Sequence, residues 1–283
     1  MIYLLLAIAS SAAMALVLKA FRTERGNRYG ILLGNYLTCV LIAFLTLPEK
    51  GMILSGSRST LLCGLAGGVF FVAALVCMQS SIRRSGATLA SAFARLGLVV
   101  CLGVSILAFG ERPGAVQTVG IVLALAAIVL LAPAGKQEGR RSAGGVGLLL
   151  LTLLLSGGAD VMAKVFDQYC PAREGSLYFF FLFTAATVLC LALLIGEGVR
   201  TGKKVRPGEF AAGILVGIPN FYSSYLLLRA LQTLSASVTY PTFSTGTILL
   251  VMVLSAVFFK ERLKKRQLPG MLLLLAALVL LNL

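Results

Sequence analysis

Two charged side chains lie inside long apolar segments of this sequence, where a charge needs a chemical reason. Arg95 lies about ten residues into segment 86–109, and Asp160 lies in segment 145–166. A charge at the centre of a membrane-spanning helix costs about 2.5–3.5 kcal/mol on insertion scales. Because a guanidinium stays charged and donates paired hydrogen bonds, Arg95 is predicted to bind a carboxylate or phosphate of a substrate. The alternative is a structural ion pair with Asp160. A reach to the membrane surface is disfavoured because the midplane is far from water.

Asp160 itself has two interpretations. It precedes Lys164 by four residues, so the two side chains share one face of a helix and can form an ion pair. Alternatively, the Asp160 carboxylate binds a proton or a cation reversibly. The second interpretation makes Asp160 a candidate coupling residue.

Other polar side chains in apolar segments extend the candidate site. Asn220, Ser223 and Ser224 have helical i, i+3, i+4 spacing, so this stripe is predicted to face something other than lipid. The candidate substrate-binding residues are Arg95, Asn220, Tyr222, Tyr225, Tyr240 and Gln79. The candidate coupling or gating residues are Asp160, Lys164, Arg229 and Lys19. Together they predict a central cavity lined by segments 60–81, 86–109, 209–231 and 235–259.

The elements that position these residues are predicted to be membrane-spanning helices. The chain has 283 residues, is 59% hydrophobic and has only 12% charged residues, against about 25% in soluble domains. Ten apolar segments are long enough to span a bilayer: 2–20, 29–47, 60–81, 86–109, 114–132, 145–166, 176–195, 209–231, 235–259 and 265–282. The fold class is therefore an all-α membrane protein with ten transmembrane helices.

The two halves of the chain repeat each other. Glu111, Arg112, Gln117 and Gly120 each recur after 150 residues, the last as Gly270. Two five-helix repeats are predicted, at residues 1–132 and 145–283, with the polar linker 133–144 between them. Because each repeat has an odd number of spans, the second copy should cross the membrane in the opposite direction. Inverted repeats of this kind are typical of secondary transporters.

The distribution of basic residues predicts the orientation. Loops after the odd-numbered spans carry 18 Lys and Arg residues, and the opposite loops carry four. Cytoplasmic loops are the basic ones. Both termini are therefore predicted to lie outside, in a plasma or inner cell membrane.

Several function classes are excluded or disfavoured. The chain has no His, and it shows no metal-ligand spacing, paired catalytic acids or nucleophile motif, so neither an enzyme nor a metal or other cofactor is expected. The net charge of +15 is explained by basic loops between apolar segments, so nucleic acid is not an expected partner. The expected partners are a small-molecule solute and the lipid bilayer, with the chain acting as a monomer or homodimer. The six cysteines show no obvious disulfide pair and are predicted to be inert thiols.

The repeated motifs resemble those of the drug/metabolite transporter superfamily, in its ten-span EamA-type branch. A span ending in Gly-Glu-Arg or Lys-Glu-Arg is followed by a glycine, at Gly110–Gly120 and again at Lys260–Gly270. Tyr240-Pro241 and the lysines near the ends of the first span of each repeat, Lys19 and Lys164, fit as well. The four-span multidrug relatives carry a membrane Glu eight residues before this lysine, where the present chain has Ser11 and Ser156.

The resemblance implies a secondary transporter that works by alternating access. Three basic residues within spans, Arg95, Lys164 and Arg229, outnumber Asp160, which favours an anionic or zwitterionic metabolite such as an amino acid, a carboxylate or a phosphorylated compound. The alternative is a proton-coupled exporter of organic cations or drugs that uses Asp160. A membrane-embedded lipid-handling protein is the least favoured possibility.

Overall fold

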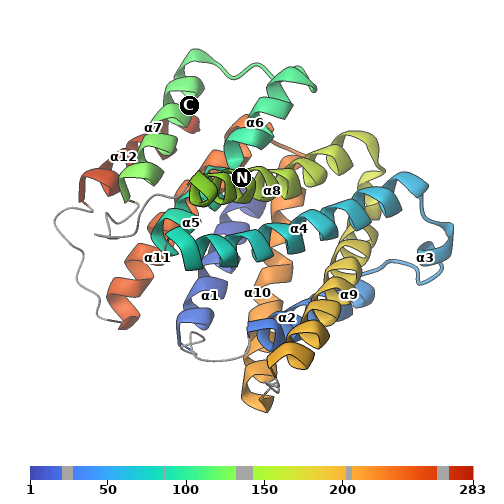
Figure 1. Ribbon diagram of the computed structural model, residues 1–283. Coiled ribbons are helices and arrows are strands. Elements are labelled where there is room, and N and C mark those ends of the chain that lie inside the picture. The colour runs from blue at the N-terminus through green and yellow to red at the C-terminus, as the bar shows by residue number, and fades with distance from the viewer. Residues whose placement is uncertain (21–27, 86, 132–142, 202–205, 260–267, 283) are drawn as a thin grey trace. The chain divides into compact units, whose positions relative to one another are not determined.

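The computed structural model describes residues 1–20, 28–85, 87–131, 143–201, 206–259 and 268–282, and its regular elements there are all helices (Figure 1). The helices are α1 (Ile2–Ala20), α2 (Arg28–Leu45), α3 (Met52–Ser55), α4 (Arg58–Ser85), α5 (Ala87–Leu96), α6 (Leu98–Leu107), α7 (Ala115–Leu131), α8 (Ala143–Tyr169), η2 (Ala172–Glu174), α9 (Gly175–Thr201), α10 (Pro207–Leu231), α11 (Ala236–Phe259) and α12 (Leu268–Leu281).

Each of the ten predicted spans corresponds to helix in the structure. Within the described residues, five helices are long and apolar enough to cross a membrane, and five shorter apolar helices occupy the remaining predicted spans. The all-helical, multi-pass membrane fold is therefore confirmed. The predicted linker 133–144 lies almost wholly outside the described residues, as does the second copy of the Glu-Arg motif at Glu261-Arg262.

The predicted span 86–109 differs from the others because it is two helices rather than one. α5 ends at Leu96 and α6 begins at Leu98. At the junction, the Gly97 N–H donates to the Ala94 carbonyl and the Val100 N–H donates to the Gly97 carbonyl, both over three residues. This tighter hydrogen bonding interrupts the α-helical pattern. The interruption lies two residues after Arg95, the candidate substrate-binding residue.

The chain divides into two compact units, and each takes elements from both predicted repeats. The first unit is Met1–Val72 with Val165–Gln232, and the second is Ala73–Lys164 with Thr233–Leu283. In the first unit, α2 packs on α9 and α10, and α1 packs on α10. In the second unit, α7 packs on α12, and α11 contacts α6, α7 and α12.

Glycines allow the helices of the first unit to approach closely. A Cβ atom on Gly217 would lie 2.7 Å from the Asn35 carbonyl oxygen, and one on Gly34 would lie 2.6 Å from the Phe210 carbonyl oxygen. Between α4 and α9, a Cβ on Gly64 would lie 2.7 Å from Phe181 Cβ. Helix backbones pack this closely only where small residues meet. The glycines of segments 60–81 and 209–231 therefore serve helix packing.

A glycine pair also allows close helix packing in the second unit. A Cβ on Gly97 would lie 2.7 Å from the backbone nitrogen of Gly157, and one on Gly157 would lie 2.6 Å from Val100 Cβ. The α5–α6 junction therefore lies directly against α8. Arg95 and Asp160 both lie close to this contact along their own helices. Arg95 precedes Gly97 by two residues, and Asp160 follows Gly157 by three.

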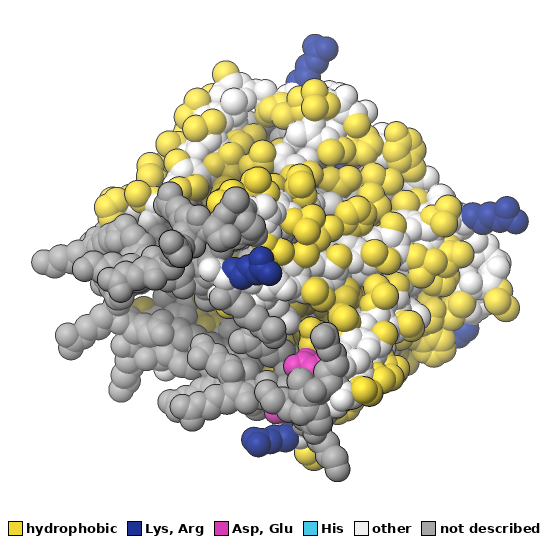
Figure 2. Space-filling model, in the orientation of Figure 1, with side chains coloured by type: hydrophobic (Ala, Val, Ile, Leu, Met, Phe, Trp, Pro, Cys, Tyr) yellow, Lys and Arg dark blue, Asp and Glu magenta, His cyan; other side chains and the backbone are white. Residues whose placement is uncertain are grey.

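The outer surfaces of the helices are apolar. Figure 2 shows hydrophobic side chains over most of the described face, with a few Lys and Arg side chains at its margins. Large apolar residues such as Leu5, Leu62, Val188 and Val257 are more than 60% exposed. A soluble protein rarely exposes so much contiguous apolar surface, and this surface is suited to contact lipid.

Candidate functional site

The ten candidate site residues are shared equally between the two units. The second unit contains Gln79, Arg95, Asp160, Lys164 and Tyr240, and the first unit contains Lys19, Asn220, Tyr222, Tyr225 and Arg229. Each set is described within its own unit. The side chain of Lys19 lies outside the described residues, although its backbone belongs to α1.

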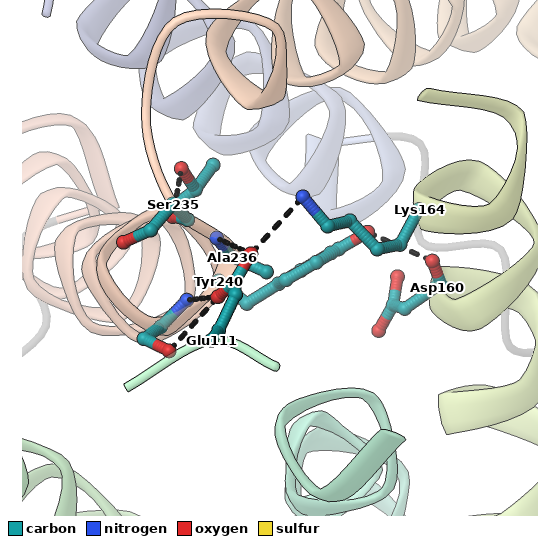
Figure 3. A network of polar contacts seen from close by, with 8 residues as sticks. Glu111, Asp160, Lys164, Ser235, Ala236 and Tyr240 are labelled. Carbon is teal, nitrogen blue, oxygen red and sulfur yellow. Dashed lines mark hydrogen bonds and ion pairs between the residues drawn. The ribbon is translucent and has the colours of Figure 1, made fainter. Parts of the chain in front are cut away.

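The central polar network of the second unit is built on Glu111, which lies in the connection between α6 and α7. Its carboxylate accepts hydrogen bonds from the backbone N–H groups of Ala236 and Ser237, at 3.1 Å each, and from the Ser237 hydroxyl at 3.0 Å. It also forms an ion pair with Lys164, with 3.0 Å between Nζ and Oε1 (Figure 3). The carboxylate thus caps the N-terminus of α11, where unpaired N–H groups and the helix dipole favour negative charge.

The contacts of Glu111 keep its carboxyl group ionised. Burial raises its pKa, but the donors from Ala236, Lys164 and Ser237 outweigh burial and leave the pKa below its usual value of 4.5. Only 15% of its side chain is exposed, and only 7% of the Lys164 side chain. The pair is therefore a largely desolvated ion pair, and donors at the start of α11 also hydrogen-bond to the Glu111 carboxylate. Such additional hydrogen bonds are needed to offset the cost of burying two charges.

Asp160 differs from the expected arrangement. Lys164 forms its ion pair with Glu111, although a pair with Asp160 was the leading structural interpretation of the sequence. The Asp160 carbonyl accepts a hydrogen bond of 2.8 Å from the Tyr240 hydroxyl, which joins α8 to α11 (Figure 3). Within the described residues, no hydrogen bond or ion pair involves the Asp160 carboxylate. The reason is geometric, because the α6–α7 connection brings a second acid to the end of α8 and the spacing of four residues cannot reveal it.

Arg95 lies in the last turn of α5, and its side chain is exposed. In the part of the chain that the structure describes, its guanidinium has neither a hydrogen bond nor an ion pair. The predicted alternative of an Arg95–Asp160 ion pair is therefore not present there. An unpaired guanidinium beside a break in a membrane helix is available to bind an anion.

Two buried threonines of α11 add polar groups to the second unit. Thr245 is 0% exposed and Thr247 is 4% exposed, and neither hydroxyl has a hydrogen-bond partner among the described residues. Thr245 occupies the position in the second repeat that Arg95 occupies in the first. Buried hydroxyls are normally paired with protein or water, so these two depart from the usual pattern.

In the first unit, Asn220 binds another helix. Its side-chain amide donates to the Asn35 side-chain oxygen at 3.1 Å, and the Cys39 thiol contacts the Gly217 carbonyl at 3.3 Å. Asn220 and Ser223 are buried. The polar stripe of segment 209–231 therefore faces α2 rather than lipid, as predicted, but its amide is already occupied by helix packing.

The remaining candidates of α10 form a stacked group near its C-terminus. The Arg229 guanidinium donates from Nη2 to the Tyr225 hydroxyl at 2.9 Å and lies over the Tyr225 ring, 5.3 Å from its centroid. Tyr225 stacks on Phe221 at 5.7 Å. Arg229 thus has aromatic and neutral partners, and no acid pairs with it in the described residues. Tyr222 is 42% exposed and its ring packs edge-on against Phe221, with 5.5 Å between the centroids. Gln79 of the second unit is buried.

Sequence reasoning missed Glu111 as a site residue. In the sequence, Glu111 serves only as a marker of the duplication. Its position directly after an apolar span is apparent there, and so is the Ser235-Ala236-Ser237 sequence that could begin a helix. Nothing in the sequence pairs these segments, which are about 125 residues apart. No group of three or more potential metal ligands occurs among the described residues.

Comparison with known proteins identifies similar proteins over nearly the whole chain. The sequence profile of the EamA-like transporter family matches residues 1–132 and 143–283. An uncharacterized protein of Haemophilus influenzae is 25% identical over 286 residues, covering 97% of this chain and 95% of the relative. The multidrug resistance protein EbrA of Bacillus licheniformis is 27% identical over 97 residues, covering 34% of this chain and 92% of EbrA.

The fold is also similar to a solved structure. A protein crystal structure superimposes with a TM-score of 0.78 at 16% sequence identity, covering 99% of this chain and 94% of the other. The likeness at this identity concerns the fold alone. The family match, by contrast, covers both halves of the sequence in tandem, including the repeated Glu-Arg motif. The chain therefore belongs to the EamA-like transporter family and is a multi-pass membrane transporter rather than an enzyme.

Proposed function

We propose that this EamA-family transporter carries a small anionic or zwitterionic metabolite, and that Arg95 binds its carboxylate or phosphate. The transporter works by alternating access and draws its energy from a solute gradient or from exchange. The substrate classes with the required chemistry are amino acids, carboxylates and phosphorylated metabolites. The predicted location is a plasma or inner cell membrane.

The observation that supports this proposal is the unpaired guanidinium of Arg95. A buried or membrane-embedded charge is normally paired, yet no acid or hydrogen-bond acceptor contacts Arg95 among the described residues. A substrate anion would supply the missing partner with two parallel hydrogen bonds.

Lys164 no longer contributes to the positive balance on which the sequence argument relied. Its charge is neutralised by Glu111 at 3.0 Å. Among the candidate site residues of the second unit, Arg95 is a cation and Asp160 an acid for which the described residues supply no side-chain partner. One positive and one negative group, each unpaired, favour a zwitterion such as an amino acid within the proposed class.

Replacement of Arg95 should abolish substrate binding without preventing folding. A thermal-shift screen of the purified protein against pooled anions, zwitterions and cations would first identify a solute that raises the unfolding temperature. For that solute, Arg95→Gln should lower the affinity roughly 100-fold or more, because the anion loses both charge and paired hydrogen bonds. Arg84→Gln, which removes an exposed arginine of α4, is the matched control. Unchanged binding by Arg95→Gln would remove Arg95 from the site.

A second candidate function is proton-coupled export of organic cations. The Asp160 carboxylate without a partner in the described residues favours it, and EbrA is named as a multidrug resistance protein. In that case Asp160→Asn should eliminate cation binding and Arg95→Gln should leave it intact. The same pair of variants therefore separates the two functions, because the anion proposal requires the opposite dependence on Arg95.

The inverted arrangement of the repeats makes a separate prediction about orientation. Both termini should lie outside the cytoplasm, because the loops predicted to be cytoplasmic hold 18 of the 25 basic residues. A fluorescent reporter that matures only in the cytoplasm should stay dark when fused to either end of the chain. A phosphatase that folds only outside should be active at both ends. The reverse pattern of the two reporters would invert the assignment.

A further inference from the structure

We propose that Cys63 and Cys170 form a disulfide bond when the protein is exposed to a thiol–disulfide oxidant. The pair links α4 to the connection between α8 and α9, within the first unit. The inference concerns the outer end of this unit and does not depend on the transported solute. Its occurrence in cells rests on the proposed orientation, in which residues 170–174 lie on the outer side.

The two thiols are neighbours although they are 107 residues apart. Their sulfur atoms lie 4.0 Å from each other, and both cysteines are reduced in this structure. A disulfide has a sulfur–sulfur distance of about 2.05 Å, so the sulfurs must approach by roughly 2 Å. Rotation of one or both cysteine side chains between staggered positions moves a sulfur by that amount.

An independent contact holds the same two segments together. The Glu174 carboxylate accepts hydrogen bonds from the Thr60 hydroxyl at 2.6 Å, the Ser57 hydroxyl at 2.7 Å and the Ser57 N–H at 3.3 Å. Glu174 is only 5% exposed. Cys63 follows Thr60 by three residues on α4, and Cys170 precedes Glu174 by four. The thiols are therefore held side by side by a buried hydrogen-bonded acid, and the disulfide would add a covalent link to an existing contact.

The surroundings favour reaction at this pair over Cys39, Cys101 and Cys190. Cys39, Cys101 and Cys190 are buried, at 0%, 0% and 1% exposure. The thiols of Cys39 and Cys190 contact backbone carbonyls of Gly217 and Tyr29. Cys63 is half-buried and so is reachable from outside the core. Disulfides form and persist on the outer side of bacterial membranes, where the compartment is oxidising.

The reaction is ordinary thiol–disulfide exchange. The Cys63 thiolate attacks one sulfur of an external disulfide, which releases one thiol and leaves a mixed disulfide on Cys63. The Cys170 thiolate then attacks Cys63 Sγ, forms the Cys63–Cys170 bond and releases the second external thiol. The two protein thiols lose two electrons and two protons, and the external disulfide gains them as two thiols.

Peptide mapping of the full chain tests the proposal. The protein is expressed in a bacterial membrane, purified in detergent without reductant, alkylated at its free thiols, digested and analysed by mass spectrometry. The expected result is a peptide that joins Cys63 to Cys170, lighter than the two separate peptides by two hydrogen atoms. Cys63→Ser should abolish this peptide, whereas Cys77→Ser, which removes another α4 cysteine, should retain it.

A second arm separates the geometry from the compartment. Protein that has been fully reduced is treated with oxidised glutathione, beside a reduced control protein whose native disulfides must reform. If Cys63 and Cys170 remain alkylatable while the control reoxidises, the geometry argument is overturned. If the pair links in this arm but is found reduced in protein taken directly from cells, formation in cells is overturned. In that case the outward placement of residues 170–174 is contradicted too, while the transport proposal is unaffected.

Discussion

Replacement of Gly213 by leucine should prevent the first unit from folding. A Cβ at this position would overlap the Ile31 carbonyl oxygen and lie 3.0 Å from the Asn35 nitrogen. These are backbone atoms of α2, so no side chain can rotate away to make room. Overpacking against side chains costs typically about 1–3 kcal/mol, and displacing a whole helix should exceed that range. We expect Gly213→Leu to give little or no monodisperse protein in detergent.

The contrast between glycines in the same helix makes this prediction specific. A Cβ on Gly208, at the start of α10, would meet nothing within 4 Å. Gly208→Ala should therefore leave the unfolding temperature unchanged or raise it slightly, because alanine is the better helix former by up to about 1 kcal/mol. Gly213→Ala should already lower the unfolding temperature strongly. Equal stability of the two alanine variants would show that α2 and α10 do not approach as closely as the structure has them.

Residues such as Gly213 show why the fold could be predicted from the sequence. Segment length, apolar composition and the paired glycines are local features, and in a bilayer every backbone group must be satisfied within a helix. Local features therefore nearly determine the secondary structure. The exception is Gly97, where the apolar segment 86–109 is divided into α5 and α6. A single glycine in a helix is common, and only the hydrogen bonds over three residues at Gly97 show that the helix is interrupted there.

The polar contacts were much less predictable, because they depend on which segments meet. Lys164 has an acid four residues before it in sequence, yet its ion pair is with Glu111 from the α6–α7 connection. The sequence makes Asn220 a candidate ligand residue, but in the structure its amide donates a hydrogen bond to Asn35 of α2. Cys63 and Cys170 are unremarkable in the sequence and adjacent in space. Sequence periodicity identifies the face on which a side chain lies, but not the residue that contacts it.

Removal of the Glu111 carboxylate should be among the most destabilising single changes in the second unit. Glu111→Ala deletes three hydrogen bonds to the start of α11 and leaves the Lys164 ammonium, 7% exposed, without its counter-charge. Breaking a buried ion pair costs about 3–5 kcal/mol, and loss of a helix cap adds about 1 kcal/mol. We expect a large fall in the unfolding temperature. Glu49→Gln, at an exposed acid, is the control and should have no measurable effect.

A double-mutant cycle separates the ion pair from the helix cap. If loss of the Glu111 counter-charge beside the Lys164 ammonium causes most of the destabilisation, adding Lys164→Met to Glu111→Ala should restore part of the stability, because the buried ammonium is removed. The cap at Ala236 and Ser237 stays lost in the double variant, so the restoration should be incomplete. A double variant less stable than Glu111→Ala would show that Lys164 has another stabilising partner that outweighs its bond to Glu111.

The ionised state of Glu111 adds a pH dependence with a definite sign. The pKa of this carboxyl is lower in the folded protein than its ordinary value of 4.5, because donors from Ala236, Lys164 and Ser237 outweigh the effect of burial. A carboxyl whose folded pKa is depressed stabilises the fold above its unfolded pKa, and this contribution disappears as the pH falls through the folded pKa. The stability difference between the native protein and Glu111→Gln should therefore be constant near neutral pH and shrink below about pH 4.5. A difference that grows on acidification would contradict the stabilisation of the Glu111 carboxylate by these donors, since it would mean that Glu111 is protonated more easily in the folded protein than in the unfolded chain.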